Sequence, residues 1–331
     1  MTDYVTSLMQ AAQFMRNHDR FLVISHVSPD GDTTGSALAT CLLLRQLGKQ
    51  YVVVNEGETP KTFGFLPRYD EILNLAKDQI DETFTHVIAV DAADSKRMGK
   101  VQHLFAPDVQ LVNIDHHPTN DCFGTINVIR TDAAATAEIM FELLEAGGFT
   151  LDNEIATCIY TGLLTDTGGF RYSNTTSNVM QIAAKLLTYG VKPGEIAERC
   201  LESITMQHVN ILRRALQSLT LTHNNLVASM RVSNQDIVET GATSEDMAGL
   251  VNYGRNIEGV EVGLLLTETK PGVVKVGLRS RSRIDVAQIA KSVGGGGHAR
   301  AAGCTLEGNI TEIEQTILAK ITEVLEVSTN E

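Results

Sequence analysis

The residues with the clearest chemical potential are aspartates and histidines in four short clusters. The first, residues 26–32 (HVSPDGD), holds His26, Asp30 and Asp32, and the others centre on Asp91, on residues 115–117 (DHH) and on Asp166. Carboxylates that converge on one place repel each other, and divalent cations remove the cost of burying them. Imidazole with several carboxylates and no nearby thiolate favours an octahedral ion such as Mn²⁺ over structural tetrahedral zinc.

The clusters contain enough ligands for two metal ions, with Asp91 placed to bridge them. Two ions about 3.5 to 4 Å apart can share a water, lower its pKa and clamp a phosphoryl group during in-line displacement. Single residues have simpler explanations. Asp32, just before two threonines, is placed to cap a helix, and a lone histidine at a strand end is more often a satisfied polar residue. Four such clusters together favour the metal-site interpretation.

Each cluster follows an apolar element that could position it. Four nearly continuous apolar runs predict strands of a parallel sheet covered on both faces: residues 21–25, 51–54, 86–90 and 109–114. Predicted helices cover residues 34–47, ended by Gly48, residues 133–146, ended by Gly147 and Gly148, and a segment that starts at Glu154. This order predicts an α/β fold, with an open, mostly parallel sheet and helices on both faces. Ligands of such sheets bind beyond the carboxyl ends of the strands, so the four clusters would meet in one crevice.

The pattern changes after about residue 190. A mainly helical segment is predicted for residues 195–219, and strands for residues 226–232, 260–268 and 273–279, with a turn at 270–272. A helix over 286–293 then leads into a glycine loop, Gly294 to His298. We therefore predict a catalytic metal-binding domain over 1–190, a mainly helical linker over 191–219, and a smaller α+β substrate-binding domain over 220–331.

At these motifs the sequence resembles the DHH family of phosphoesterases, named for the triplet at residues 115–117. The C-terminal half resembles the DHH-associated domain, whose mark is the glycine run with His298 followed by residues 301–303 (AAG). The resemblance covers almost the whole chain and is greatest to the compact, stand-alone oligoribonuclease (nanoRNase) and pAp phosphatase type. Val293 stands where the family often has an aromatic residue, which affects packing or a base contact rather than the chemistry.

The resemblance implies two metal ions that share one ligand. Their ligands would be His26, Asp30 and Asp91 for one ion, and Asp32, Asp91, His116 and Asp166 for the other. Asp115 would orient a ligand, and His117 would face the substrate phosphate, where it stabilises charge or protonates the leaving oxygen. The implied activity is Mn²⁺-dependent hydrolysis of short RNA oligonucleotides, of dinucleotides such as pApA and of 3′-phosphoadenosine 5′-phosphate (pAp), by a hydroxide that bridges the two metals.

The segment from Lys270 to Arg300 carries seven basic side chains against one acid, Asp285, in a chain whose net charge is -13. A concentrated basic region suits a small anionic ligand. Predicted substrate contacts are Arg279, Ser280, Gly295, Gly296, Gly297, His298, Arg300 and Arg171. Glycines let backbone amides approach a phosphate, although such a run can also be only a flexible turn. Arg281 and Arg283 could equally be solvated residues of an exposed strand. Arg171 could equally pair with a nearby acid, and Tyr172 could pack against the protein instead of stacking on a base.

Composition excludes several classes of protein. The net charge of -13 argues against a protein that coats long nucleic acid, and no apolar run approaches the roughly 18 residues of a membrane span. The first ten residues show no secretory signal, and five scattered cysteines suggest reduced thiols, so we expect a cytoplasmic protein.

Two other functions stay open at this stage. One is a family II inorganic pyrophosphatase, which shares the four N-terminal motifs but is disfavoured by the glycine-histidine signature. The other is a non-catalytic nucleotide-binding or metal-sensing module, which the complete ligand set disfavours. The choice among Mn²⁺, Mg²⁺ and Co²⁺ and the formation of a homodimer stay open too.

Overall fold

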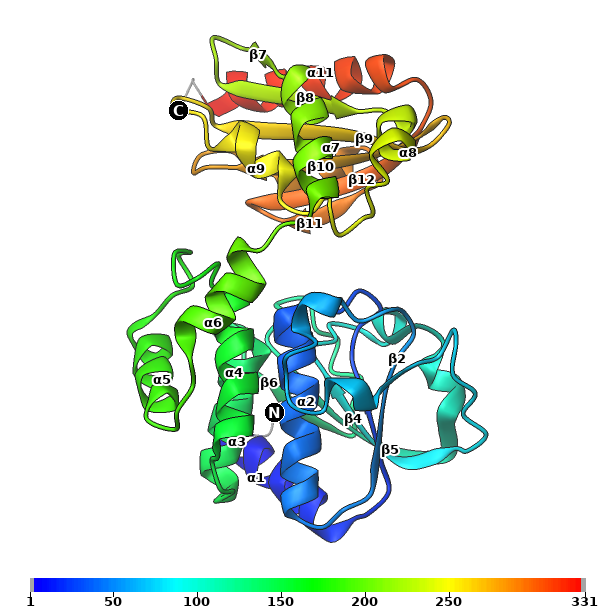
Figure 1. The fold of residues 1–331 in the computed structure, drawn as a ribbon, viewed down its shortest axis with the longest axis vertical. Helices are drawn as coiled ribbons and strands as arrows, with labels where there is room; N and C mark the ends of the chain where they lie inside the picture. The colour runs from blue at the N-terminus through cyan, green and yellow to red at the C-terminus, as the bar shows by residue number, and fades with distance from the viewer. Residues whose placement is uncertain (1–2, 329–331) are drawn as a thin grey trace. The chain divides into compact units, whose positions relative to one another are not determined.

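The computed structural model describes residues 3–328, which divide into two compact units, one ending at Ser203 and the other starting at Ile204. The first unit, blue to green in Figure 1, contains a six-stranded sheet. The sheet has the strand order β3-β2-β1-β4-β5-β6. Its strands are β1 (Phe21–Ile24), β2 (Tyr51–Asn55), β3 (Ile72–Asn74), β4 (Phe84–Val90), β5 (Phe105–Asp115) and β6 (Ile126–Ile129). Every neighbouring pair is parallel, so the predicted open, parallel α/β sheet is confirmed.

The central strand β1 shows why the apolar runs are continuous. Phe21 and Val23 belong to one hydrophobic core, and Leu22 and Ile24 belong to another on the opposite face. All four side chains are fully buried. Because both faces of the sheet are covered, the strand has no polar face, as is usual for parallel sheets.

The first unit also contains helices and short helical turns. They are α1 (Tyr4–Asn17), α2 (Gly31–Gln46), α3 (Thr136–Gly147), α4 (Asn153–Asp166), α5 (Ser177–Leu187) and α6 (Pro193–Ala197), with 3₁₀ segments η1 (Lys61–Phe63), η2 (Tyr69–Glu71) and η3 (Ser95–Leu104) and a π-helical turn η4 (Glu198–Glu202). The sequence analysis did not predict α1, α5, β3 or β6.

Three predicted helix boundaries are wrong, two for local reasons and one, the start of α3, because of a contact with the distant Asp32. Helix α2 starts at Gly31 rather than Thr34 because the carboxylate of Asp30, not that of Asp32, caps it by accepting the N–H of Thr33 at 3.0 Å. Helix α3 starts at Thr136 rather than residue 133. The predicted helical segment 195–219 is interrupted after Glu202, and a new helix begins where the side chain of Thr205 accepts the N–H of His208 at 2.9 Å.

Helices α2 and α4 lie side by side (Figure 1) and approach so closely that only glycine fits at two points. A Cβ atom on Gly35 would lie 2.5 Å from the carbonyl oxygen of Cys158, and one on Gly162 would lie 2.7 Å from Oδ1 of Asp32. At Gly35 the backbone of α2 lies directly against the backbone of α4, whereas the lack of a side chain at Gly162 leaves room for the side chains of Ala137 and Asp32. At Gly35 the spacing of the two helices is therefore set by backbone contact rather than by side-chain size.

The second unit contains a mixed six-stranded sheet of order β11-β12-β10-β9-β8-β7, in which β8 and β9 are parallel and the other pairs antiparallel. Its strands are β7 (Thr220–Thr222), β8 (Val227–Val232), β9 (Val262–Lys270), β10 (Val273–Ser280), β11 (Gly296–His298) and β12 (Ala301–Glu307). Its helices are α7 (Met206–Gln217), α8 (Asn234–Thr240), α9 (Leu250–Arg255), α10 (Val286–Ser292) and α11 (Ile310–Ser328). The predicted α+β class of this unit and its turn between β9 and β10 are confirmed.

Two expectations for the second unit are wrong. The glycine segment is not simply a loop, because Gly296, Gly297 and His298 form the edge strand β11, paired with β12. A Cβ on Gly297, whose φ is +137°, would lie 2.5 Å from the carbonyl oxygen of Ala301, so glycine is required for this pairing. Arg281 and Arg283 do not alternate along a strand, since β10 ends at Ser280.

In the part of the chain that the structure describes, no helix combines the length and apolar character needed to cross a membrane.

Candidate metal centre

The four clusters from the sequence meet at one edge of the first sheet. His26 follows β1, Asp91 follows β4 and Asp115 ends β5, and these three strands are neighbours in the sheet. Their carboxyl ends therefore face the same edge. The start of α2 supplies Asp30 and Asp32, and the last residue of α4 supplies Asp166.

The structure groups these side chains into three possible metal-binding sets, each with ligand atoms within 4.8 Å of one another. The sets are His26, Asp30 and Asp91; Asp32, His116 and Asp166; and Asp91, His116 and His117. Asp91 and His116 each belong to two sets, so the three sets form one continuous cluster. Every ligand named in the sequence analysis lies in this cluster.

Asp91 occupies the centre of the cluster. Its Oδ2 lies 3.5 Å from Nε2 of His26, and its Oδ1 lies 3.6 Å from Nε2 of His116 and 3.6 Å from Nδ1 of His117. Burial raises the pKa of this carboxyl, but the contact with His26 and the neighbouring imidazoles outweigh burial and hold the pKa well below its usual range. The backbone of Asp91 is left-handed, with φ of +58°, a conformation that a non-glycine residue rarely adopts outside special sites.

Asp32 is completely buried at the N-terminus of α3. Its Oδ2 accepts the N–H of Thr136 at 2.6 Å, and its Oδ1 accepts the N–H of Ala137 at 2.8 Å. The helix N-terminus favours the negative charge. Burial, followed by the charges of Asp91, Asp166 and Asp30, nevertheless raises the pKa of Asp32 well above its usual range.

The same causes act on Asp166, where burial and then the charges of Asp91 and Asp30 raise the carboxyl pKa. Its Oδ2 lies 3.5 Å from Nε2 of His116. Buried carboxylates that repel each other, beside imidazole nitrogens, form a donor set that a divalent cation would neutralise. The residues present therefore fit a divalent metal site.

Asp115 is buried and contacts His117 rather than His116. Its Oδ1 lies 2.7 Å from Nδ1 of His117, and its Oδ2 accepts the Nδ2–H of Asn120 at 2.6 Å. Burial lowers the pKa of His117, but the hydrogen bond to Asp115 and the charge of Asp91 more than compensate, so the pKa is raised. His117 is thus held in one orientation and favoured as an imidazolium, which suits a proton donor or charge stabiliser.

Four further residues reach the cluster that the sequence analysis did not single out. The hydroxyl of Thr33 lies 2.6 Å from Oδ2 of Asp91, and the hydroxyl of Thr136 donates to Oδ1 of Asp91 at 2.9 Å. Asn120 holds the second oxygen of Asp115, and Nη1 of Arg97 lies 3.4 Å from Nε2 of His117. The sequence does hint at Arg97. Asp94 is a residue type that caps helices, and the helical turn that it caps carries Arg97, six residues after Asp91.

The predicted substrate contacts of the second unit gather at one end of its sheet. Across β12, Ala301 pairs with His298 on one side and with Arg279 on the other. His298 and Arg300 are exposed and Arg279 is half-buried. Ser280 is buried, and its hydroxyl donates to the carbonyl of Ala299 at 3.3 Å.

Gly295 precedes β11, and Gly296 and Gly297 lie in it. A Cβ on Gly295 would lie 2.3 Å from the carbonyl oxygen of Gly303, so this glycine is needed for the chain's own packing. Arg171 belongs to the first unit, is exposed, and donates from Nε to the carbonyl of Gly168 at 2.5 Å. The structure thus separates the predicted substrate contacts into one group on the second unit and one residue on the first.

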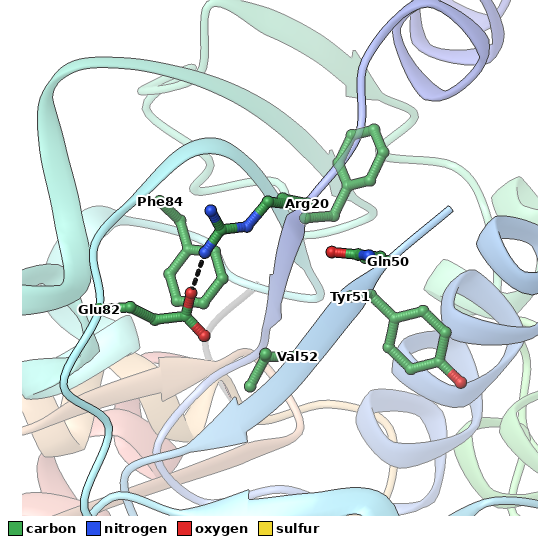
Figure 2. Close-up of a pocket in the computed structure, with 7 residues that line it drawn as sticks. Arg20, Gln50, Tyr51, Val52, Glu82 and Phe84 are labelled. Carbon is green, nitrogen blue, oxygen red and sulfur yellow. Dashed lines mark hydrogen bonds and ion pairs between the residues drawn. The ribbon is translucent and has the colours of Figure 1, made fainter. Parts of the chain in front are cut away.

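A separate pocket of about 250 Å³ (Figure 2) lies at the amino ends of β1, β2 and β4. The cluster lies at the carboxyl ends of β1, β4 and β5. Its lining includes Arg20, Gln50, Tyr51 and Glu82. Figure 2 shows Arg20 and Glu82 paired with each other. Since its two charged groups neutralise each other, this pocket is a weaker candidate than the cluster.

Comparisons with known proteins agree with these motifs. Residues 20–163 match the DHH family, N-terminal domain, and residues 224–326 match the DHHA1 domain. The bifunctional oligoribonuclease and PAP phosphatase NrnA of Thermus thermophilus is 34% identical over 306 residues, which cover 92% of this chain and 89% of that protein. The protein of the same name from Bacillus subtilis is 27% identical over 294 residues, covering 87% of this chain and 90% of that protein.

Solved structures share the fold. An exopolyphosphatase-related protein from Bacteroides fragilis has a TM-score of 0.91 at 23% identity and covers 98% of both chains. RecJ from Thermus thermophilus in complex with Mn²⁺ has a TM-score of 0.57 at 14% identity, with 98% of this chain and 55% of that chain covered.

Proposed function

Because the chain belongs to the DHH/DHHA1 phosphoesterase family, we propose that it hydrolyses short RNA oligonucleotides, including dinucleotides such as pApA, and pAp, with bound divalent ions, most simply Mn²⁺. The observation that carries this proposal is the continuous cluster of carboxylates and imidazoles around the buried side chains of Asp32 and Asp91. Relatives similar over nearly their whole length are named for oligoribonuclease and PAP phosphatase activity, which supports the substrate class.

The proposed metal ligands are those expected from the sequence. His26, Asp30 and Asp91 would hold one ion, and Asp32, Asp91, His116 and Asp166 the other. Bound divalent ions supply positive charge beside the phosphoryl group and lower the pKa of water. RecJ, which shares this fold, has been crystallised with Mn²⁺.

The chain's own residues would position the phosphate and move the proton. Held by Asp115, His117 would protonate the leaving oxygen or stabilise its charge, since its pKa is raised. The guanidinium of Arg97 beside it would attract the phosphate.

The second unit would bind the remainder of the nucleotide. We propose that the region from about residue 220 onward supplies Arg279, Ser280, Gly295, Gly296, Gly297, His298 and Arg300, with Arg171 contributed by the region up to about residue 190. Arginine and histidine side chains with backbone amides suit a second phosphate. A single compact basic group also suits a short ligand better than a long nucleic acid.

The test is a turnover panel of pAp, pApA, RNA of two to five nucleotides, a longer RNA and pyrophosphate, each with Mn²⁺ and with a chelator. We expect Mn²⁺-dependent turnover of pAp and the short RNAs. His116→Ala should abolish turnover without loss of folding, whereas His103→Ala, at an exposed histidine of η3, should retain it. Turnover of pyrophosphate alone would favour a pyrophosphatase, and binding of pAp without turnover would favour a nucleotide-binding or metal-sensing module.

We also propose a cytoplasmic location. All five cysteines are free thiols, three of them buried, as is usual for proteins of reducing compartments. Cell fractionation would test this, and recovery of the protein outside the cytoplasm would contradict it.

A further inference from the structure

One short segment contacts three of the proposed metal ligands. It consists of residues 133–135 and the first two residues of α3, and it is called the loop 133–137 below. The backbone N–H groups of Thr136 and Ala137 donate to the two oxygens of Asp32, and the hydroxyl of Thr136 donates to Asp91. The carbonyl oxygen of Ala133 lies 3.3 Å from Nδ1 of His116. The position of this loop therefore sets the direction of ligands that come from three different sequence motifs.

The loop also reaches the fourth motif through a side chain. Nδ2 of Asn174 lies 3.1 Å from the carbonyl oxygen of Ala134 and 3.1 Å from that of Asp166, and it donates to both. Most of these loop contacts use backbone atoms. They depend on where the backbone of the loop lies, so the anchor of that backbone becomes important.

Glu138 supplies such an anchor from the first turn of α3. Its side chain is 2% exposed, and its Oε2 accepts the N–H of Ala134 at 2.7 Å. Its Oε1 accepts Nδ2–H of Asn178 at 2.7 Å and pairs with Nη2 of Arg130 at 2.5 Å. A buried carboxylate whose two oxygens are both bonded has little freedom to move.

We propose that Glu138 is a positioning residue for the metal site: through the N–H of Ala134 it fixes the loop 133–137 and thereby aligns Asp32, Asp91 and His116. The inference rests on the proposed function, because those three residues are metal ligands only under that proposal. Glu138 itself lies outside the ligand sets. Residues that orient metal ligands from outside the first layer of contacts commonly change metal affinity 10- to 100-fold when mutated.

Glu142 is a matched control on the same helix. It pairs with the same Arg130 and accepts a hydrogen bond from the hydroxyl of Tyr4 at 2.5 Å. Neither of these two partners belongs to the loop 133–137. Glu142→Gln thus disturbs the ion pairs of Arg130 while leaving the N–H of Ala134 bound to Glu138.

The experiment measures Mn²⁺ affinity by titration calorimetry, together with kcat and KM for pAp, in full-length variants. For Glu138→Gln we expect about 10-fold or greater loss of Mn²⁺ affinity and about 10-fold lower kcat, with KM changed less than about twofold. For Glu142→Gln we expect Mn²⁺ affinity within about twofold of wild type, and a change in thermal stability only.

Asn178→Ala keeps the inference testable if Glu138→Gln does not fold. Asn178 is exposed, so its loss removes one hydrogen bond to Glu138 without opening the core. We expect a smaller loss of Mn²⁺ affinity, about two- to fivefold. The inference is overturned if folded Glu138→Gln keeps the wild-type Mn²⁺ affinity, or, where that variant does not fold, if Asn178→Ala keeps it. It is also overturned if Glu142→Gln loses as much Mn²⁺ affinity as Glu138→Gln. Failure of the proposed function gives a different result: the wild-type protein would bind Mn²⁺ but hydrolyse neither pAp nor short RNA.

Discussion

Replacing Glu261 with glutamine removes a buried charge that organises the segment after β10. The side chain of Glu261 is 3% exposed. Its Oε1 accepts the N–H groups of Ser282 at 3.0 Å, Arg283 at 2.6 Å and Ile284 at 3.0 Å. Three consecutive amides thus converge on one carboxylate oxygen, and they hold the chain that follows the proposed contacts Arg279 and Ser280.

The magnitude follows from the change in charge. Glutamine keeps an oxygen for these amides, but hydrogen bonds to a charged group contribute about 1.5 to 3 kcal/mol and neutral ones about 0.5 to 1.5 kcal/mol. A neutral amide oxygen also has two lone pairs for three donors. We therefore expect Glu261→Gln to lower the free energy of unfolding at pH 7 by about 2 kcal/mol, roughly 30-fold in the equilibrium constant.

The pH dependence gives the effect a defined sign. Burial raises the pKa of Glu261, but the three N–H donors more than compensate, so the pKa in the folded protein lies below its usual range. The carboxylate therefore stabilises the fold fully above the unfolded-state pKa of about 4.3, and this stabilisation is lost as the pH falls through the folded-state pKa. The difference between wild type and variant should be largest near pH 7 and should shrink below about pH 4.3.

The assay is urea unfolding followed by circular dichroism, with amide hydrogen exchange to follow the N–H groups of Ser282 to Ile284. Glu258→Gln, at an exposed position three residues away, makes the same change in charge and should leave the unfolding free energy within about 0.5 kcal/mol of wild type. Equal stability of Glu261→Gln and wild type at pH 7, or a difference that grows as the pH falls, would refute the reasoning.

Three further outcomes are expected. Mn²⁺ at about 100 times its dissociation constant should raise the free energy of unfolding by about 2.7 kcal/mol. The effect should appear as a higher melting temperature that a chelator reverses, and an unchanged melting temperature would contradict a metal site in the folded chain. Gly297→Ala should destabilise the second unit by about 2 kcal/mol or more in thermal unfolding, because its Cβ would overlap Ala301. Gly296→Ala, with open space around it, should change the stability by less than about 0.5 kcal/mol, and equal effects of the two substitutions would disprove the steric argument. Arg97→Ala should lower kcat/KM for pAp about 10-fold or more in steady-state assays, while full activity would exclude Arg97 from phosphate binding.

The sequence was most informative where one physical rule determines the outcome. The strands were found because burial on both faces leaves runs such as residues 21–24 apolar throughout. Once those strands are parallel, residues just after them, such as His26 and Asp91, must share one edge of the sheet. The placement of His26, Asp91 and Asp115 at one edge thus follows from the parallel direction of the strands.

Features that depend on tertiary contacts were not predictable in this way. The start of α3 is one, because Asp32, about 100 positions earlier, receives the N–H groups of Thr136 and Ala137. The partner of Asp115 is another, since the spacing of the triplet is compatible with either histidine. The strand character of Gly296 to His298 also arises from pairing with β12, which local propensity opposes.

The glycine contacts between α2 and α4 have a mechanical consequence for the cluster. Asp30 and Asp32 lie at the start of α2, and Asp166 is the last residue of α4. These ligands therefore lie on two helices that are in close contact at Gly35 and Gly162. Backbone pressed against backbone is far less compressible than a layer of side chains that can change rotamer. Substitutions elsewhere in the surrounding core can therefore be absorbed by repacking without altering the gap between the two helices. A side chain added at Gly35 would widen this gap directly, and one added at Gly162 would displace the carboxylate of Asp32.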